Sequence, residues 1–261
     1  AQRGTKESAN KITLKDIKKF HKSYFVATNS ILAIVGNVTK QQAEGIANKI
    51  STSLPTGKVQ EKIAAVKPSS ETKQHIDFPS QQSHVRMGQI GIDRGNPDYF
   101  NLYVGNHVLG GGGFTSRLVK EVRSNRGLSY SVYSYFLPYE QSGPFMLGLQ
   151  TRSDQVTEAV HVCNQVLSDF IENGPTQEEL VLSKQNIMNG FPLRVGSNRD
   201  ILGYLSLIGY YDLPLTYLND FNKNIEKVGL EDVKKAFRKH LNLDTFVTVV
   251  VGSEQKSEED K

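Results

Sequence analysis

The chain is 261 residues long and carries 31 Lys and Arg against 27 Asp and Glu, a formal charge of +4 at pH 7. This length exceeds the usual size of a single domain and predicts one large domain or two smaller ones. The basic residues are spread along the sequence, which argues against a nucleic-acid partner. No stretch approaches the roughly 20 apolar residues that span a bilayer, so the sequence predicts no transmembrane segment.

Apolar periodicity and capping residues predict the elements in chain order. Helices are expected at 13–24 and 39–51, with a buried strand ending at Gly36 between them. Beyond a Pro-, Lys- and Ser-bearing linker, strands are predicted at 73–78, 84–92, 128–137 and 144–151, and helices at 98–109, 116–125, 153–173, 176–189, 198–210, 214–227 and 230–241, before a last strand that ends at Gly252. Strands followed by a block of helices predict an α+β fold, an antiparallel-rich sheet with helices packed mainly on one face.

Two segments of the chain align without a gap. They are TLKDIKKFHKSYFVATNSILAIVG from Thr13 and GLEDVKKAFRKHLNLDTFVTVVVG from Gly229. Each predicts a capped helix, a short loop and a buried strand that ends in glycine, and their separation is about the length of a whole domain, too long for a solenoid. We therefore predict two homologous domains: residues 1–57 form the tail of a truncated first domain, 58–72 a linker, and 73–261 the second domain.

Metal and nucleophile motifs are missing from the sequence. No two histidines lie three or four residues apart, and none has an adjacent glutamate in either zinc-peptidase order, so the residues predict no metal site in this chain. The six are His21, His75, His84, His107, His161 and His240. The single cysteine, Cys163, follows an apolar helical pattern and is predicted to pack in a core.

The segment LGGGGFTSRLVKEVRSNRGLSYSVYSYF, residues 109–136, joins a glycine run to a basic helix and a tyrosine-rich strand. The run consists of Gly110, Gly111, Gly112 and Gly113. It lacks the Gly-Lys-Ser/Thr ending of a phosphate loop and follows a predicted helix rather than a strand. We predict that these glycines form a hinge or a close-packing element that shapes a substrate-binding region.

Arg123 and Tyr130 are the candidate functional pair of that segment. Arg123 lies in the last helical turn, Gly127 can take a left-handed conformation, and Tyr130 begins the next strand, so both side chains can point to one place. A guanidinium can hold a peptide carbonyl, and a phenol can donate to a developing oxyanion. The alternative is that Arg123 complements the helix dipole and Tyr130 is an ordinary strand aromatic.

At these residues the chain resembles the insulinase or pitrilysin family of zinc metallopeptidases, which includes mitochondrial processing peptidase. The resemblance covers nearly the whole chain. It is carried by NHVLGGGGFTSRLVKEVRSNRGLSYSVYS, by GPTQEELVLSKQNIMNGFPL, and by the closing segments NSILAIVGNVT and DTFVTVVVGS. The first looks like the signature of the family's non-metal domain, in which an arginine and a tyrosine spaced as Arg123 and Tyr130 complete an active site.

The resemblance implies a division of labour between two halves of a zinc-dependent endopeptidase. Zinc would be held by residues outside this chain, in a missing N-terminal half or in a partner subunit. The two halves would form a clamshell, and the assembly would be a homodimer or a heterodimer. There zinc and a glutamate base would activate water, while Tyr130 stabilises the oxyanion and Arg123 positions the peptide substrate. The chain by itself would then be inactive. A bacterial periplasmic or envelope location is the family-level expectation.

A non-catalytic role is the alternative that the same resemblance leaves open. Members of the family also serve as structural core subunits of a respiratory complex, so the chain is alternatively a peptide-binding or assembly subunit. The presence of both Arg123 and Tyr130 favours the peptidase. Peptide binding by this chain alone, compared with cleavage after a zinc-bearing half is added, separates the two hypotheses.

Overall fold

A computed structural model describes residues 4–61 and 63–253, and these form two compact units. The smaller unit comprises the described residues of Ala1–Ile63 together with Arg194–Leu215, and the larger unit those of Ala64–Leu193 and Thr216–Lys261. The sequence placed 194–215 with the second domain, whereas in the structure these residues pack with the N-terminal segment. Nothing in the sequence of residues 194–215 indicated that they would pack with the N-terminal segment.

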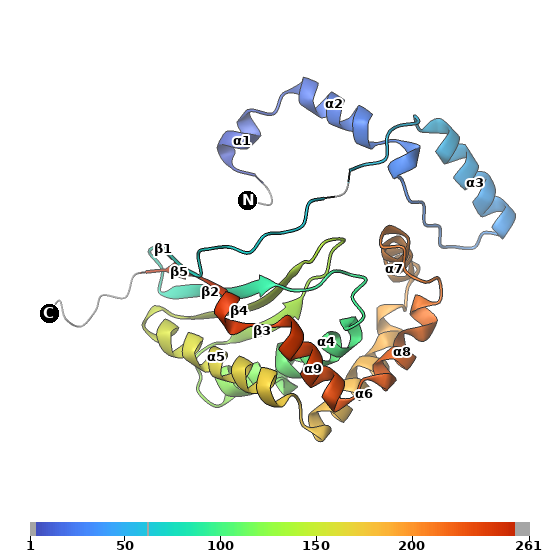
Figure 1. Cartoon of the computed structure of the whole chain (residues 1–261). Coiled ribbons are helices and arrows are strands. Elements are labelled where there is room, and N and C mark those ends of the chain that lie inside the picture. The colour runs from blue at the N-terminus through green and yellow to red at the C-terminus, as the bar shows by residue number, and fades with distance from the viewer. Residues whose placement is uncertain (1–3, 62, 254–261) are drawn as a thin grey trace. The chain divides into compact units, whose positions relative to one another are not determined.

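The larger unit is built on one five-stranded sheet in the order β1-β5-β2-β4-β3 (Figure 1). The strands are β1 (Lys73–Asp77), β2 (Gln82–Ile90), β3 (Ser131–Phe136), β4 (Pro144–Arg152) and β5 (Val247–Gly252). β1 runs parallel to β5, and every other neighbouring pair is antiparallel. The sheet is therefore mixed but antiparallel-rich, as the sequence predicts, with β3 at one edge and β1 at the other.

Helices cover one face of this sheet (Figure 1). α4 (Tyr99–Asn106) and α5 (Val156–Asn173) contact the strands, α9 (Leu230–His240) packs on both of these helices, α8 (Tyr217–Lys227) packs on α4, and α6 (Gln177–Arg194) follows α5 in the chain. Alternate strand residues such as Val85, Phe145 and Leu147 point into the core, where they are fully buried with Phe170 and Phe237 of the helices. Apolar residues at alternate strand positions, facing helices with one apolar stripe, produce this two-layer α+β core, and the predicted fold class is confirmed.

The smaller unit contains α1 (Lys6–Asn10), α2 (Leu14–Tyr24), α3 (Lys40–Ser53) and α7 (Asn198–Tyr210). The helices begin where the capping residues predict: Thr13 accepts from the N–H of Asp16, and Thr39 accepts from that of Gln42. The strand predicted to end at Gly36 is wrong, because residues 31–35 have no strand pairing. A strand needs a neighbouring strand for its backbone groups, and none of the described strands lies in this unit.

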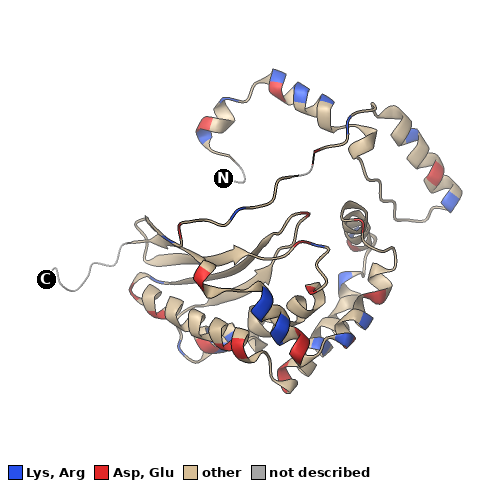
Figure 2. Cartoon of the chain, in the orientation of Figure 1, with Lys and Arg blue, Asp and Glu red and all other residues tan. Residues whose placement is uncertain are grey.

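Most charged residues of the larger unit lie on its helices, only acidic ones on α5 and both signs on α9, while the strands are mainly uncharged (Figure 2). This distribution follows from a helix-covered sheet, since each helix turns a polar side away from the core. No helix within 4–61 and 63–253 is long and apolar enough to cross a membrane.

Candidate functional site

The glycine run lies against Ser134 of β3; its first two glycines end a π-helical turn at His107–Gly111, and a second π-helical turn follows at Val119–Ser124. A Cβ on Gly110 would clash with the hydroxyl of Ser134 and lie 2.7 Å from its backbone nitrogen. Gly113 has φ +62°, a left-handed conformation that glycine adopts without strain. The structure thus contains a close backbone approach at Gly110, and the hinge role of the run stays a prediction.

Asn106, which precedes the glycine run, fixes the run to the sheet. Its side-chain amide donates to the backbone oxygen of Ser134 at 2.9 Å and accepts from the Ser134 hydroxyl at 2.7 Å, and both residues are buried. These bonds satisfy polar groups at the edge of β3 that would otherwise lack partners. Asn106 is a positioning residue that the sequence analysis did not single out. The signal available in the sequence was an amide side chain four residues before a run of glycines.

Arg123 and Tyr130 are brought together, but through the tyrosine backbone. The Arg123 guanidinium donates from Nη1 to the carbonyl oxygen of Tyr130 at 3.0 Å and lies over the ring of Phe114, 4.7 Å from its centroid. Gly127, with φ +64°, makes the turn between the two residues, as the sequence predicts. Tyr130 is 85% exposed as a residue. Phe114, also exposed, is a member of the site that sequence reasoning missed.

The backbone around Tyr130 is held by hydroxyl groups. Thr151 of β4 donates to the carbonyl of Leu128 at 2.6 Å, and Ser129 donates to the carbonyl of Gln150 at 2.5 Å. Both hydroxyls are buried. With the bond from Arg123, these bonds hold the backbone of Tyr130 directly before β3, while Tyr130 itself is exposed.

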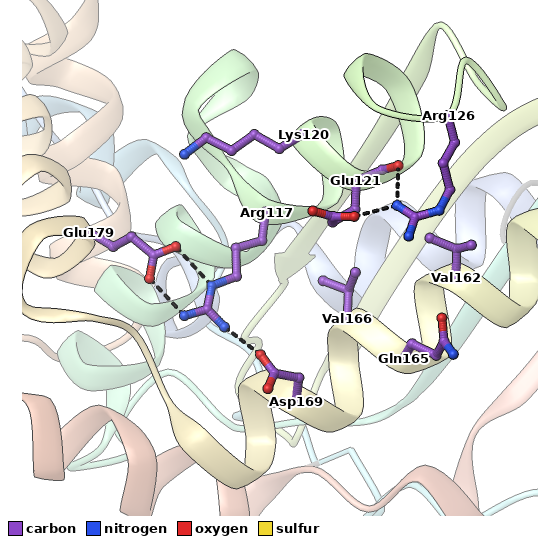
Figure 3. Close-up of a pocket in the computed structure, with 9 residues that line it drawn as sticks. All are labelled: Arg117, Lys120, Glu121, Arg126, Val162, Gln165, Val166, Asp169 and Glu179. Atoms are coloured by element: carbon purple, nitrogen blue, oxygen red, sulfur yellow. Dashed lines mark hydrogen bonds and ion pairs between the residues drawn. The ribbon is translucent and has the colours of Figure 1, made fainter.

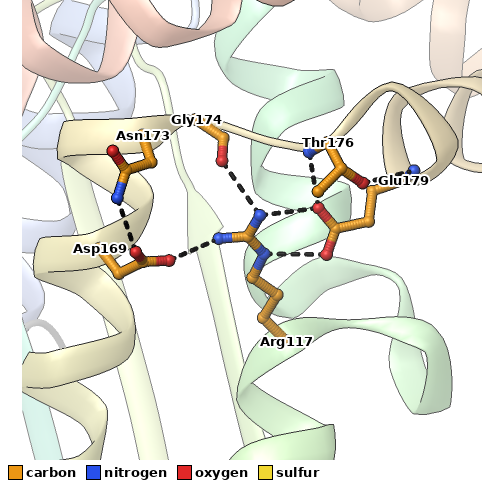
Figure 4. A network of polar contacts seen from close by, with 6 residues as sticks. All are labelled: Arg117, Asp169, Asn173, Gly174, Thr176 and Glu179. Carbon is orange, nitrogen blue, oxygen red and sulfur yellow. Dashed lines mark hydrogen bonds and ion pairs between the residues drawn. The ribbon is translucent and has the colours of Figure 1, made fainter.

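Arg117 is the centre of a polar network that joins the basic helix to α5 and α6 (Figure 4). Its guanidinium forms two bonds with Glu179, at 2.8 and 2.7 Å, one with Asp169 at 2.8 Å, and one with the carbonyl of Gly174 at 3.0 Å. Hydrogen bonding to Glu179 raises the pKa of Arg117. Burial alone would raise the pKa of Glu179, but bonds from Arg117 and the N–H of Thr176 lower it below its ordinary value.

This network lines a groove of about 500 Å³ on the helical side (Figure 3). Arg126 pairs with Glu121 at one end, and Val162 and Val166 of α5 contribute apolar surface. The carboxylates of Asp169 and Glu179 are already bound by Arg117. The groove therefore carries a structural clamp that fixes the segment between Gly113 and Tyr130 on its helices.

The histidines and the cysteine that could serve a metal site or a nucleophile were also located in the structure. Among the described residues, no group of three His, Cys, Asp or Glu side chains is placed to hold a metal ion. His107 contacts the Ser183 hydroxyl through Nδ1 at 3.0 Å, and His240 contacts Asp98 through Nε2 at 2.8 Å. Cys163 is fully buried, and burial raises the pKa of its thiol to about 12, so it is a core residue rather than a nucleophile.

The structure is an α+β domain in which Arg123 and Tyr130 lie near the edge strand β3 and follow a run of glycines. Residues 11–187 match the family model described as "Peptidase M16 inactive domain". The chain therefore belongs to the peptidase M16 family, and the resemblance seen in the sequence motifs is confirmed.

Known proteins agree with this assignment. A crystal structure of a peptidase M16 inactive domain from Pseudomonas fluorescens is 40% identical, with a TM-score of 0.94, over 99% of this chain and 61% of that one. A "Non-peptidase homolog YmxG" from Helicobacter pylori is 28% identical over 97% of this chain and 59% of its own length. An "Uncharacterized zinc protease YmxG" from Bacillus subtilis is 25% identical over 87% of this chain and 56% of its own length. The chain thus spans about three-fifths of these relatives.

Proposed function

We propose that this chain is the non-metal half of a zinc-dependent endopeptidase, to which it supplies Arg123 and Tyr130. The observation that carries the proposal is the exposed phenol of Tyr130 on a backbone held by Arg123 and Thr151. The zinc protease named among its relatives supports a peptidase as the whole protein. The zinc-bearing half and a peptide are the partners in this proposal, and a periplasmic or envelope location stays an expectation.

Among the described residues no group of three His, Cys, Asp or Glu side chains fits a zinc ion, and in this proposal the zinc is held by residues outside this chain. The chain's own contribution is electrostatic. The Tyr130 phenol would donate a hydrogen bond to the oxyanion that forms as a peptide carbonyl is attacked, which lowers the energy of the transition state more than that of the bound substrate. Arg123 keeps the tyrosine backbone in place, and its guanidinium, shared between a carbonyl and the Phe114 ring, presents positive charge beside a bound peptide.

Replacing Tyr130 by phenylalanine in the full-length protein tests the role of the phenol. We expect kcat for an internally quenched peptide to fall by about 100-fold or more, as on loss of an oxyanion donor, with KM little changed. The ring is kept, so packing and stability should stay within about 0.5 kcal/mol of the parent.

Tyr135→Phe is the matched control for that experiment. Tyr135 is also exposed and lies on β3, five residues beyond Tyr130, which directly precedes that strand, and it is outside the Arg123 contact. Its phenylalanine variant should keep the parent kcat. An unchanged kcat in Tyr130→Phe, or an equal loss in both variants, would contradict the assigned role.

A binding subunit without peptidase activity is the second candidate, favoured by the non-peptidase relative from Helicobacter pylori. In that case the exposed tyrosine and arginine hold a peptide that is not cut. Anisotropy of a labelled extended peptide with this chain alone measures binding, and cleavage is then assayed in the full-length, zinc-supplemented protein. Binding without cleavage selects the second candidate, whereas cleavage that depends on Tyr130 selects the first.

A further inference from the structure

The sheet face that the helices leave uncovered carries a groove of about 490 Å³, within the range of ligand sites. Its floor is apolar and is formed by Ile90 of β2, Met146 of β4, and Val247 and Val249 of β5. The register places these strands side by side, with Gly88 opposite both Met146 and Val247. The groove therefore crosses three neighbouring strands of the larger unit.

Two strand glycines shape this face. A Cβ on Gly88 would lie 2.6 Å from the Met146 sulfur, and one on Gly148 would clash with the Arg86 guanidinium and lie 2.9 Å from the Tyr133 ring. Glycine weakens the interior of a strand and marks positions that other groups approach closely. Here it lets Met146 and Arg86 lie along the sheet, so that an apolar and a cationic group border one groove.

Arg86 is one of the arginines that form no ion pair with a carboxylate among the described residues, and Arg123, over the Phe114 ring, is another. Arg117, Arg126 and Arg152 each form an ion pair with a carboxylate. Among the described residues Arg86 forms none, and its guanidinium rests 5.5 Å from the centroid of the Tyr133 ring. An aromatic face orients a guanidinium and leaves its N–H groups available for a planar anion.

The charge of the groove is one-sided. Arg86 and Lys67 line it, and none of the described residues that line it is Asp or Glu. A ligand that complements this surface combines a carboxylate, for the guanidinium, with an apolar body, for Met146 and the valines. Tyr139 and Ser142 are also among the lining residues, and hydroxyl groups of this kind can pair with amide groups, which a hydrocarbon chain does not have.

We propose that this groove binds the C-terminal residue of a peptide, with the terminal carboxylate on Arg86 and an apolar side chain on Met146 and Val249. The site is separate from Arg123 and Tyr130 and needs neither zinc nor catalysis. It would hold the free end of an extended peptide, whatever happens to the rest of that peptide.

Fluorescence anisotropy with the 261-residue chain tests the proposal. The probe is a fluorescein-labelled Gly-Ala-Ala-Ala-Leu with a free carboxylate, compared with the same peptide as its C-terminal amide. We expect the amide to bind at least about 10-fold more weakly, the usual value of a charge-assisted pair. Equal binding of the two peptides, or no saturable binding of the acid up to about 1 mM, would overturn the proposal.

Variants identify the residue that reads the carboxylate. Arg86→Gln should reduce binding of the acid to the level of the amide and leave binding of the amide unchanged. Arg86→Lys keeps the charge without the two-pronged geometry and should fall between. Arg152→Gln is the control, since Arg152 lies at the far end of β4 and pairs with Asp154. An acid affinity unaffected by Arg86→Gln, or equally reduced by Arg152→Gln, would overturn the assignment.

The apolar part of the site has its own test. Met146→Ala should weaken the leucine peptide several-fold and the corresponding alanine-ended peptide much less, since the lost contact is with the side chain. Octanoate is the competitor that represents a lipid carboxylate. Displacement of the peptide by octanoate at concentrations equal to those of an unlabelled peptide would overturn the commitment to a peptide, and failure to displace it supports that commitment. Circular dichroism and Tm of each variant exclude unfolding as the cause.

Discussion

Helix α2 of the smaller unit and helix α9 of the larger unit occupy matching positions of the sequence repeat. They begin at Leu14 and Leu230, the second residues of the two copies, and both are eleven residues long. In each helix an aspartate of the first turn accepts a hydrogen bond from the backbone N–H of the residue before the helix. Asp16 accepts from Thr13 at 2.9 Å, and Asp232 accepts from Gly229 at 3.2 Å. A single 3₁₀ turn follows both at matching positions, Ala27–Asn29 and Leu243–Thr245. Local sequence is sufficient to produce these elements.

Burial separates the two copies. In α9, Val233 and Phe237 are fully buried, whereas in α2 Ile17 and Phe20 are 56% and 57% exposed. After the 3₁₀ turn, the second copy continues as β5, paired with both β1 and β2, while residues 31–35 of the first copy form no strand. Helices satisfy their backbone groups internally, but a strand and an apolar helix face both need partners from elsewhere. Among the described residues, only the larger unit provides a sheet.

Truncating the buried aromatic of the second copy should have the largest effect on stability. Phe237 packs against Phe170, with ring centroids 4.8 Å apart, and against Phe136 at 5.9 Å. Phe237→Ala leaves a cavity in the centre of the core, and we expect the free energy of unfolding to fall by about 3–5 kcal/mol. Urea denaturation followed by circular dichroism measures the change.

Phe20→Ala, in the first copy, is the control for an exposed aromatic, although in the gapless alignment Phe20 meets Ala236 and His21 meets Phe237. Its exposed ring contributes little to burial in this chain, so the expected change is within about 0.5 kcal/mol. A loss comparable to that of Phe237→Ala would mean that α2 is packed in solution as α9 is, and would remove the difference between the two copies.

A smaller loss is expected where α4 meets α9. A Cβ on Gly105 would clash with the Phe237 ring and lie 2.7 Å from a methyl of Val233. Gly105→Ala should therefore destabilise the larger unit by about 1–3 kcal/mol through overpacking. Gly190→Ala in α6 is the control, because nothing lies within 4 Å of its added methyl, and helix propensity predicts a gain of up to about 1 kcal/mol. Equal stability of the two variants would contradict close packing of α4 on α9.

The same contrast explains what could be predicted from the sequence. The helices at 13–24 and 230–241 followed from capping residues and apolar spacing, because both signals are local. The strand before Gly36 was predicted on the pattern of its second copy, which is equally apolar but lies beside β2. Pattern alone does not report whether a partner strand is present. That information is tertiary.

In the candidate site, too, contacts between residues close in sequence were predictable and contacts between distant residues were not. Arg123, Gly127 and Tyr130 are close in sequence, so their proximity was predictable from one helix end and one turn. The bonds from Asn106 to Ser134 and from Arg117 to Glu179 join residues far apart in the chain, and no local signal pairs them. The π-helical turns at His107–Gly111 and Val119–Ser124 were likewise predicted as ordinary helix, since one extra residue per turn hardly changes apolar spacing.

The smallest expected effect is on the pH dependence of the α4–α9 contact. Asp98, just before α4, accepts hydrogen bonds from Lys239 and His240 of α9, each at 2.8 Å, and the bond from Lys239 is the main cause that lowers the pKa of Asp98 below 3.8. The folded state therefore favours the carboxylate, and this stabilisation is complete above about pH 3.8 and lost as the pH falls through the folded-state pKa. Because the pair is partly exposed, Asp98→Asn should lower stability at pH 7 by under about 1 kcal/mol. The variant's disadvantage should shrink towards pH 3, while Glu140→Gln in an exposed loop leaves the profile unchanged. If the loss of stability in Asp98→Asn were constant from pH 7 to about pH 3, the carboxylate would not hold α9 through its charge. Packing at Phe237 would then be the remaining difference between the second copy and the first.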